Sequence, residues 1–171
     1  MLKTQGHYKL VTMKIDPKFA SLAALLVLLG FGAGYLLSTE PDVSFQNPDI
    51  TLSVDPECKL NEAACERPIA EAGSMLFSIG PKPVLGASPL TFELTTNNID
   101  VDRAAIDLKG VSMNMGSYRL LLEADGEGGF RTEGNLPVCV RNQMLWQADV
   151  WLQSPKLGLI KVPFQFTAYK R

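Results

Sequence analysis

The feature that most constrains this chain is an uncharged, largely apolar run from Phe19 to Thr39. About 20 apolar residues span the ~30 Å hydrocarbon layer of a bilayer when they form a helix. The preceding residues 1–18 carry four lysines and one aspartate, and basic residues stay on the cytoplasmic side of a membrane. We therefore expect a cytoplasmic segment at 1–18, a transmembrane anchor at 19–39 and an exported part from Glu40 onward.

A cleaved signal peptide is the alternative interpretation of the same run. Such a peptide has a shorter apolar core, about 7 to 15 residues, and a small-x-small cleavage site after it. The residues at 34–38, Gly-Tyr-Leu-Leu-Ser, do not form that pattern. The length and the missing site favour an uncleaved anchor.

The exported residues 40–171 suit a single domain that can bury its own core. The chain has 16 basic and 18 acidic residues, so removing those of residues 1–18 leaves 12 basic (16 − 4) and 17 acidic (18 − 1), a net charge of -5. This balance argues against binding nucleic acid or anionic lipid through a basic surface.

Three cysteines, Cys58, Cys65 and Cys139, lie in the exported part. An oxidising compartment favours disulfides, and Cys58 and Cys65 share a segment with little apolar content that a disulfide would stabilise. We predict this pair, with a metal role for the two as the alternative. Cys139 is then a free thiol or a soft metal ligand.

Short runs of β character follow one another along the exported part, separated by glycine, proline and asparagine turns. The predicted domains are a linker and cysteine-containing loop at 40–73, in which Leu60 to Cys65 could form a short helical turn, and a β domain at 74–171. The predicted strands are Ile50–Val54 (the alternative start of the domain), Met75–Ile79, Leu90–Thr96, Ala104–Leu108, Tyr118–Ala124, Phe130–Val140, Met144–Leu152 and Ile160–Ala168.

The run from Met144 to Leu152 alternates apolar and polar residues, which predicts a strand with one buried and one wet face. Trp146 lies in phase with the apolar positions and is the expected core aromatic. Several such strands without a helix outside the membrane predict a mainly β fold. We expect an immunoglobulin-like antiparallel β-sandwich behind one N-terminal transmembrane helix.

The sole histidine, His7, lies before the anchor, on the cytoplasmic side in this interpretation. Serine or cysteine nucleophiles paired with histidine, histidine zinc sites and blue-copper sites all need an imidazole. We therefore expect that the protein is not an enzyme.

Sulfur-bearing residues gather in two nearby segments of the sequence. Met113 and Met115 point to one face if extended, and the turn after Cys139 would bring Met144 back toward it. Thioether and thiolate sulfurs are preferred ligands of Cu(I), so Met113, Met115, Cys139 and Met144 are the candidate metal ligands. The alternative is packing, since methionine and lone cysteine are common core residues.

The elements Gly-Val-Ser-Met-Asn-Met-Gly at 110–116, Leu-Pro at 136–137 and the Trp146 strand resemble the FixH/YtkA-like group of small membrane-anchored bacterial domains. The resemblance extends over residues 74–169. It implies an immunoglobulin-like fold in the periplasm, anchored in the bacterial inner membrane, with a role in copper handling or in the assembly of respiratory oxidases. This chain departs from the pattern by its three cysteines and by the lack of an external histidine.

Two lesser patterns have structural and functional interpretations. Asn98, Asp100 and Asp102 alternate, so their oxygens could bind Ca²⁺, although a solvated turn explains them equally well. In the anchor, Gly30 and Gly34 form a Gly-x-x-x-Gly strip on which another membrane helix could pack.

The sequence thus supports three functional hypotheses. The first is a periplasmic accessory protein that binds Cu(I) or assists the assembly of an inner-membrane complex. The second is a purely structural interaction module of such a complex, without metal. The third, thiol exchange between the Cys58–Cys65 pair and Cys139, lacks a Cys-x-x-Cys motif.

Overall fold

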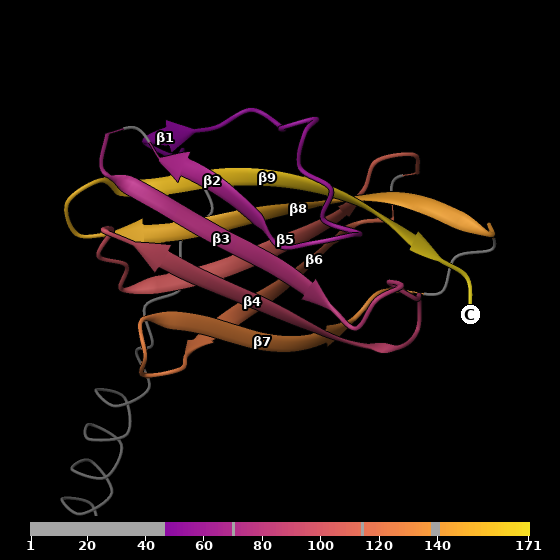
Figure 1. Ribbon diagram of the computed structural model, residues 1–171. Coiled ribbons are helices and arrows are strands. Elements are labelled where there is room, and N and C mark those ends of the chain that lie inside the picture. Colours follow the sequence, from indigo (N-terminus) through magenta and orange to yellow (C-terminus); the bar gives the residue numbers. More distant parts are fainter. Residues whose placement is uncertain (1–46, 70, 114, 138–140) are drawn as a thin grey trace, which may run out of the picture. The chain divides into compact units, whose positions relative to one another are not determined.

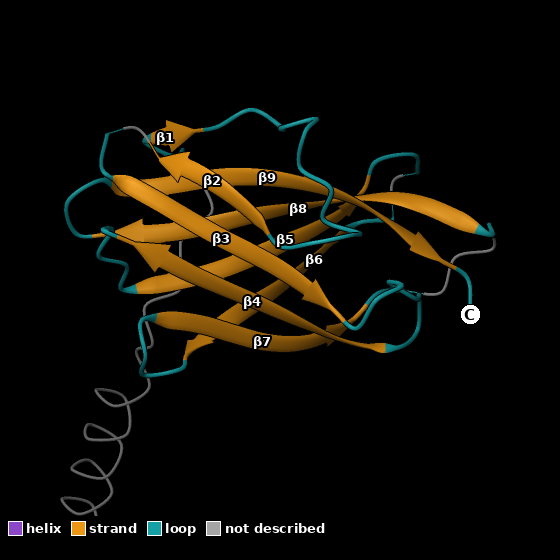
Figure 2. Cartoon of the chain, in the orientation of Figure 1, coloured by secondary structure: helices purple, strands orange, loops and turns teal. Residues whose placement is uncertain are grey.

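The runs of β-branched and aromatic residues form strands, as predicted. This computed structural model describes residues 47–69, 71–113, 115–137 and 141–171, which consist of strands and loops (Figure 2). Figure 1 labels the strands, which are β1 (Ile50–Thr51), β2 (Cys65–Ile69), β3 (Gly73–Gly80), β4 (Pro89–Asn97), β5 (Arg103–Gly110), β6 (Ser117–Ala124), β7 (Gly129–Asn135), β8 (Gln143–Ser154) and β9 (Gly158–Tyr169).

These strands form one sheet in the order β1-β9-β8-β5-β6-β7-β4-β3-β2. The sheet curls back on itself, because the rings of Phe77 on β3 and Phe164 on β9 lie 4.9 Å apart between centroids. Strands β3 and β9 are near opposite edges of the sheet, and Figure 1 shows β3 and β4 in front of β8 and β9.

The hydrophobic core lies on the inner face of the curl. Strand β8 contributes the apolar positions that the alternation predicted, and Trp146 among them is 1% exposed, which confirms it as a core aromatic. The other large side chains that are fully buried come from both halves of the sheet: Phe77, Phe92, Phe164, Phe166, Leu60, Ile69, Met75, Ile79, Leu90, Leu94 and Ile106.

The sheet is mixed, so the prediction of a purely antiparallel sheet is wrong at one edge. Strand β1 pairs in parallel with β9, in the register Ile50↔Ile160. The carboxylate of Asp49 accepts a hydrogen bond from the Leu159 amide at 2.7 Å, which places the entering chain beside the first residues of β9. From there it runs in the direction of β9, and only Ile50 and Thr51 of the predicted 50–54 strand pair with it.

Strand β2 lies within the segment that the sequence assigned to a linker and loop. Its residues alternate between buried and exposed, with Cys65, Arg67 and Ile69 pointing inward. Pro68 is tolerated because β2 is an edge strand and Pro68 points outward. The sequence of β2 does not show this alternation, because Arg67 takes an inward position and Pro68 follows it. The preceding residues form one turn, in which the amides of Glu62 and Ala63 donate to the Lys59 carbonyl.

Strand β7 ends at Asn135, five residues before the predicted end at Val140, and Leu136 and Pro137 follow it outside the strand. The predicted anchor, including Gly30 and Gly34, lies outside the described residues, and so does Cys139. Within the described ranges, no helix is both long and apolar enough to cross a membrane.

Candidate functional site

The loop between β5 and β6 carries the two methionines of the Met-x-Met element. Lys109 and Ser117 are the last paired residues of this hairpin, so its tip includes residues 111–113 and 115–116. Met113 is 40% exposed and Met115 is 36% exposed. Gly116 has a φ of 80°, a left-handed conformation that glycine adopts without steric cost and that closes the loop. The hairpin therefore presents two methionine residues at the surface.

Met144 lies in the core beneath this loop. It is 4% exposed, at the start of β8, and a side chain on Gly110 would collide with its Cε methyl group and with the carbonyl oxygen of Met113. The Val111 amide donates to the Leu145 carbonyl at 3.0 Å, which holds the loop against β8. Gly110 is thus the contact between the buried methionine and the exposed loop.

The four predicted ligands are therefore not seen as one cluster. Met113 and Met115 share the loop, Met144 is a core residue next to it, and Cys139 lies between the described residues Pro137 and Arg141. Among the residues that the structure describes, no group of three or more histidine, cysteine, aspartate or glutamate side chains could hold a metal ion. The soft donors that the described part of this loop offers are the thioethers of Met113 and Met115.

A small cavity lies beside the start of β8 and the end of β9. Its volume is about 90 Å³, and its lining includes Trp146, Pro137, Ala168 and Tyr169. Ala168 is the cross-strand partner of Met144. The buried indole nitrogen of Trp146 has no hydrogen-bond partner in the described part of the chain. The cavity is large enough for one small side chain or a few waters, and too small for a drug-sized ligand.

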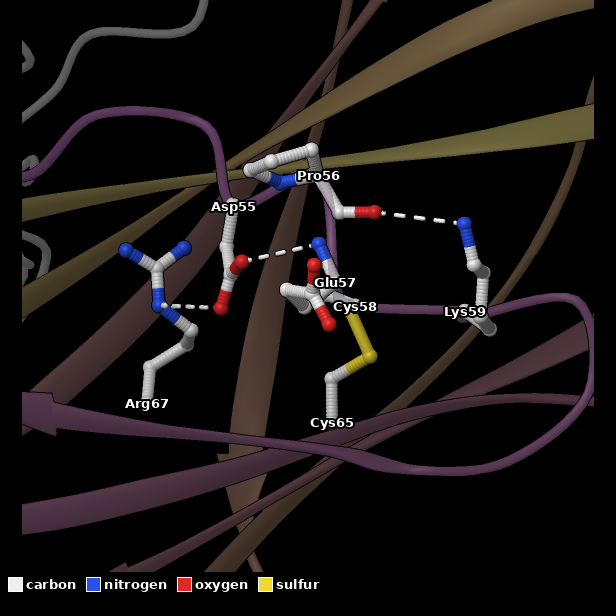
Figure 3. The surroundings of a disulfide bond; sticks show 7 residues. All are labelled: Asp55, Pro56, Glu57, Cys58, Lys59, Cys65 and Arg67. Carbon is white, nitrogen blue, oxygen red and sulfur yellow. Dashed lines mark hydrogen bonds and ion pairs between the residues drawn. A yellow bond between two sulfur atoms is a disulfide. The ribbon is translucent and has the colours of Figure 1, made fainter.

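The predicted disulfide is confirmed between Cys58 and Cys65 (Figure 3). It closes a loop whose Leu60 is buried and whose Asn61 bonds twice to the backbone of Thr167 on β9, once as donor and once as acceptor, both at 2.7 Å. Thr167 precedes Ala168, so this loop borders the methionine region. The disulfide thus closes a loop that is hydrogen-bonded to β9.

The Arg67 side chain joins this loop to the core, as Figure 3 shows for its ion pair with Asp55. Its Nη2 donates to the Ser53 carbonyl at 2.9 Å, and its guanidinium carbon lies 6.0 Å from the centre of the Phe164 ring. A buried charge is tolerated here because it is paired and lies near an aromatic ring.

A second polar group, which the sequence analysis did not identify, lies on the outer face of β5, β8 and β9. Asp149 is 1% exposed, contrary to the wet face expected for it. It accepts from Lys109 at 3.0 Å and Gln147 at 2.7 Å, and it pairs with Lys161 at 3.1 Å. Asp107, its neighbour across the strands, accepts from Ser117 and pairs with Lys109 at 3.1 Å.

Asp149 and Lys109 of this outer group stabilise each other's charged form. Burial disfavours the charge of Asp149, but hydrogen bonds from Gln147, Lys109 and Lys161 outweigh it and hold its pKa below the usual value. Burial likewise opposes the charge of Lys109, but its bonds to Asp149 and Asp107 raise its pKa. Both residues therefore stay ionised at neutral pH, which suits a structural ion pair and not a general base.

The period-two pattern of a single strand could not have revealed the outer group, because its members come from different strands. Cross-strand register places Lys109 opposite Gln147, and Asp107 opposite Asp149, on one face. Neither spacing is visible in the linear sequence before the strands are paired.

The residues predicted to bind Ca²⁺, Asn98, Asp100 and Asp102, lie in the connection between β4 and β5. Asp100 accepts from Lys156 at 2.5 Å, and Asn98 has a φ of 59°, typical of asparagine in a left-handed turn. The side chain of Asp100 is thus bound to a cation of the chain itself.

No protein-family model and no curated protein matches this chain. Among solved structures, the crystal structure of an engineered protein is similar to 56% of this chain, at 13% identity and a TM-score of 0.36. This chain spans 20% of the length of that engineered protein. A likeness of this extent says nothing about function.

Proposed function

We propose that the protein is a non-enzymatic, membrane-anchored accessory protein that binds Cu(I) at the β5–β6 loop. Met113 and Met115 are the primary ligands, and Cys139 and Met144 complete the set. The observation that carries the proposal is the exposure of both methionines on one hairpin tip, at 40% for Met113 and 36% for Met115. Apolar side chains usually pack inward, so two adjacent exposed methionines favour a role in binding.

The donor set fits a soft cation. Thioether sulfur binds Cu(I) in preference to hard cations such as Mg²⁺ and Ca²⁺, which take oxygen ligands. Met113 and Met115 lie outside the core, as their exposed fractions show. Met144 is buried beside Gly110, so its participation requires a shift of the loop or of its own flexible side chain.

We also propose a fold type and a cellular location for the protein. The curled sheet is consistent with an immunoglobulin-like sandwich of the FixH/YtkA-like type, which the Met-x-Met-Gly element at 113–116 suggests. Residues 19–39 would anchor the chain in the bacterial inner membrane with the β domain in the periplasm. Gly30 and Gly34 would contact a helix of the membrane complex that the protein serves.

The absence of enzymatic activity is part of the proposal. The most deeply buried carboxylate of the described residues, that of Asp149, is held ionised by two lysines and one glutamine. A carboxylate in that state neither donates a proton nor acts as a base with a raised pKa.

Competition for Cu(I) tests the metal site. The full-length chain, purified in detergent with its disulfide intact, is titrated anaerobically against a colorimetric Cu(I) chelator. We expect the Met113→Leu/Met115→Leu variant to lose about tenfold or more in Cu(I) affinity, about 1.4 kcal/mol or more. Met75→Leu, at a fully buried core methionine, is the matched control and should retain the wild-type affinity. Equal affinity of the wild type and the double variant would rule out these ligands.

The alternative is an interaction module without metal, and one observation favours it. Val111 and Tyr118 flank the methionines and are 47% and 42% exposed, so the hairpin tip is an apolar surface even without its sulfurs. In this case Met113→Leu and Cys139→Ser leave function intact, whereas changes at Gly30 or Gly34 impair it. Loss of function in the leucine variant with normal function at both glycines would contradict the alternative.

A further inference from the structure

Strand β9 has one backbone edge that faces away from β8. The two strands pair without interruption over the whole of β9, so every second residue of β9 directs its N–H and C=O away from β8. The odd-numbered residues do so, because the amides of Leu159, Thr167 and Tyr169 all bond to groups outside β8. The outer edge of β9 therefore consists of the backbone groups of residues 159, 161, 163, 165, 167 and 169.

The entering chain occupies this edge at the start of β9. The Leu159 amide donates to the carboxylate of Asp49 at 2.7 Å, and the Asp49 amide donates to the Leu159 carbonyl at 2.8 Å. The Lys161 carbonyl accepts from the Leu52 amide at 3.0 Å. The first two residues of the edge are thus bonded within the chain.

Two other segments occupy the edge at the end of β9. The side chain of Asn61 bonds to both backbone groups of Thr167. The Tyr169 amide donates to the Val84 carbonyl at 2.9 Å, and the Tyr169 carbonyl accepts from the Gly86 amide at 2.8 Å. The last two residues of the edge are therefore also bonded.

A gap remains between these bonded stretches, at Pro163 and Gln165. Proline has no N–H, so the gap offers two carbonyls and one amide, that of Gln165. Within the described part of the chain, no residue on this side bonds to these three groups, and the Gln165 side chain bonds to Gln147 instead. The gap is thus a short stretch of open strand edge with one donor between two acceptors.

A groove of about 570 Å³ opens beside the gap. One wall is the connection between β1 and β2, including Val54 and the disulfide-bonded Cys58, which Figure 3 draws. The other wall consists of Leu145 on β8 and of Gln165 and Thr167 on β9. A volume of this order holds an organic ligand. The open edge is therefore accessible from a groove and not sealed by the connection.

The unbonded groups match the backbone of an extended peptide. In a parallel pair, a residue bonds to the two residues that flank its opposite number. A peptide residue opposite Phe164 would therefore donate its N–H to the Pro163 carbonyl and accept from the Gln165 amide, and Pro163 needs no N–H for this. The edge already binds an amide group at Thr167, where Asn61 both donates and accepts. Donor and acceptor together favour a peptide over a simple ion.

We propose that the gap at Pro163 and Gln165 binds an extended segment of a partner protein, which adds to the edge of β9 as a short strand. The bonds at Lys161 and Thr167 limit the pairing to residues 162–166, roughly 17 Å at about 3.3 Å per residue. The proposal goes beyond copper binding and does not depend on it. Its test contains no metal, so that failure of one proposal leaves the other standing.

Amide hydrogen exchange of the full chain in detergent micelles, read by NMR, tests whether the gap is open. The Gln165 amide should exchange at least about tenfold faster than the amides of Thr167 and Tyr169, which are bonded to Asn61 and Val84. Equal protection of Gln165 would show that another segment of the chain fills the gap, and would overturn the proposal.

Titration with a capped tripeptide, acetyl-Thr-Val-Thr-amide, tests binding in the same sample. Its β-branched residues favour an extended backbone, and its caps make it resemble a segment within a protein. We expect a saturable shift of the Gln165 amide resonance. The same peptide with all of its backbone nitrogens methylated cannot donate, and it should bind about tenfold more weakly. The peptide without caps should bind no more tightly than the capped one.

A proline substitution removes the donor from the protein side. Gln165→Pro deletes the amide that faces the gap and no bond to β8, as Pro163 already does two residues earlier. Peptide binding, followed at the Leu145 amide, should weaken about tenfold or more. Gln165→Ala keeps the N–H and is the matched control, which should bind like the wild type. An unchanged thermal midpoint confirms that the proline variant folds.

Four results of the peptide titrations would overturn the proposal. They are the lack of a saturable shift at Gln165, equal binding of the methylated peptide, tighter binding of the peptide without caps, and wild-type binding by Gln165→Pro. If the proline variant does not fold, the comparison of the methylated and unmethylated peptides on the wild type decides.

Discussion

The methyl group of Met144 fills the space that a side chain on Gly110 would occupy. The carbonyl oxygen of Met113 borders the same space, so one glycine separates a core thioether from the exposed loop. The size of residue 110 therefore controls how the loop sits on the core.

Gly110→Ala should disturb the methionine loop. The added methyl group meets both Met144 and the backbone of Met113, and overpacking of this kind costs about 1–3 kcal/mol. We expect a lower free energy of unfolding in denaturant titrations together with weaker Cu(I) retention. Gly80→Ala is the matched control, because a Cβ there has no neighbour within 4 Å. If Gly110→Ala matches the wild type in both measurements, Gly110 is not in close contact with Met144 and Met113.

Removing the Cys58–Cys65 disulfide should destabilise the domain without unfolding it. The loop that it closes is short, with a sequence separation of 7. In the chain-entropy model such a loop contributes about 2.5 kcal/mol. Cys58→Ser/Cys65→Ser should lower the free energy of unfolding by that amount, measured by circular dichroism in denaturant. A decrease in the free energy of unfolding of less than about 0.5 kcal/mol would show that the other contacts of the loop hold it on β9 without the disulfide.

The side chain of Asn61 should stabilise the folded state through its two hydrogen bonds to Thr167. Its side chain satisfies both the amide and the carbonyl of Thr167, and Asn61→Ala leaves these two groups without that partner. Each lost bond costs about 1 kcal/mol, so we expect about 2 kcal/mol in total and faster hydrogen exchange of the Thr167 amide. Asn142→Ala, at an exposed turn, is the control and should change neither quantity.

Acid should destabilise the wild type through Asp149. Its pKa is lowered in the folded state, so its contribution is present above the unfolded value, near 4, and is lost as the pH falls through the folded value. Asp149→Asn should cost about 2 kcal/mol at pH 7, less than for a fully buried pair because Lys109 and Lys161 reach solvent. The free energy of unfolding of the Asp149→Asn variant should also fall less steeply below pH 5 than that of the wild type. Glu93→Gln, at an exposed ion pair with Arg131, is the control and should change the free energy of unfolding at pH 7 by less than about 1 kcal/mol.

Much of the β structure could be predicted from local pattern. In β8 the alternation identified Met144, Trp146 and Ala148 as inward residues, because period two is a property of the single strand. The disulfide followed from the proximity of Cys58 and Cys65 and from the inferred compartment.

The rest depends on contacts between distant segments. Arg67 takes an inward position in β2 because Asp55, Ser53 and Phe164 surround its guanidinium, and no local pattern contains these partners. Asp149 is buried on a face expected to be wet because Lys161 on β9 and Lys109 on β5 cover its charge. The methionine site was predicted as four sulfurs together, but Met144 follows the strand period into the core, whereas Met113 and Met115 stay on the loop.

X-ray absorption at the copper edge of the Cu(I)-loaded full-length chain tests the central claim most directly. The account predicts a ligand shell of sulfur that loses sulfur in Met113→Leu/Met115→Leu and is unchanged in Met75→Leu. A shell of nitrogen or oxygen, or a spectrum that the double variant leaves unchanged, would contradict it.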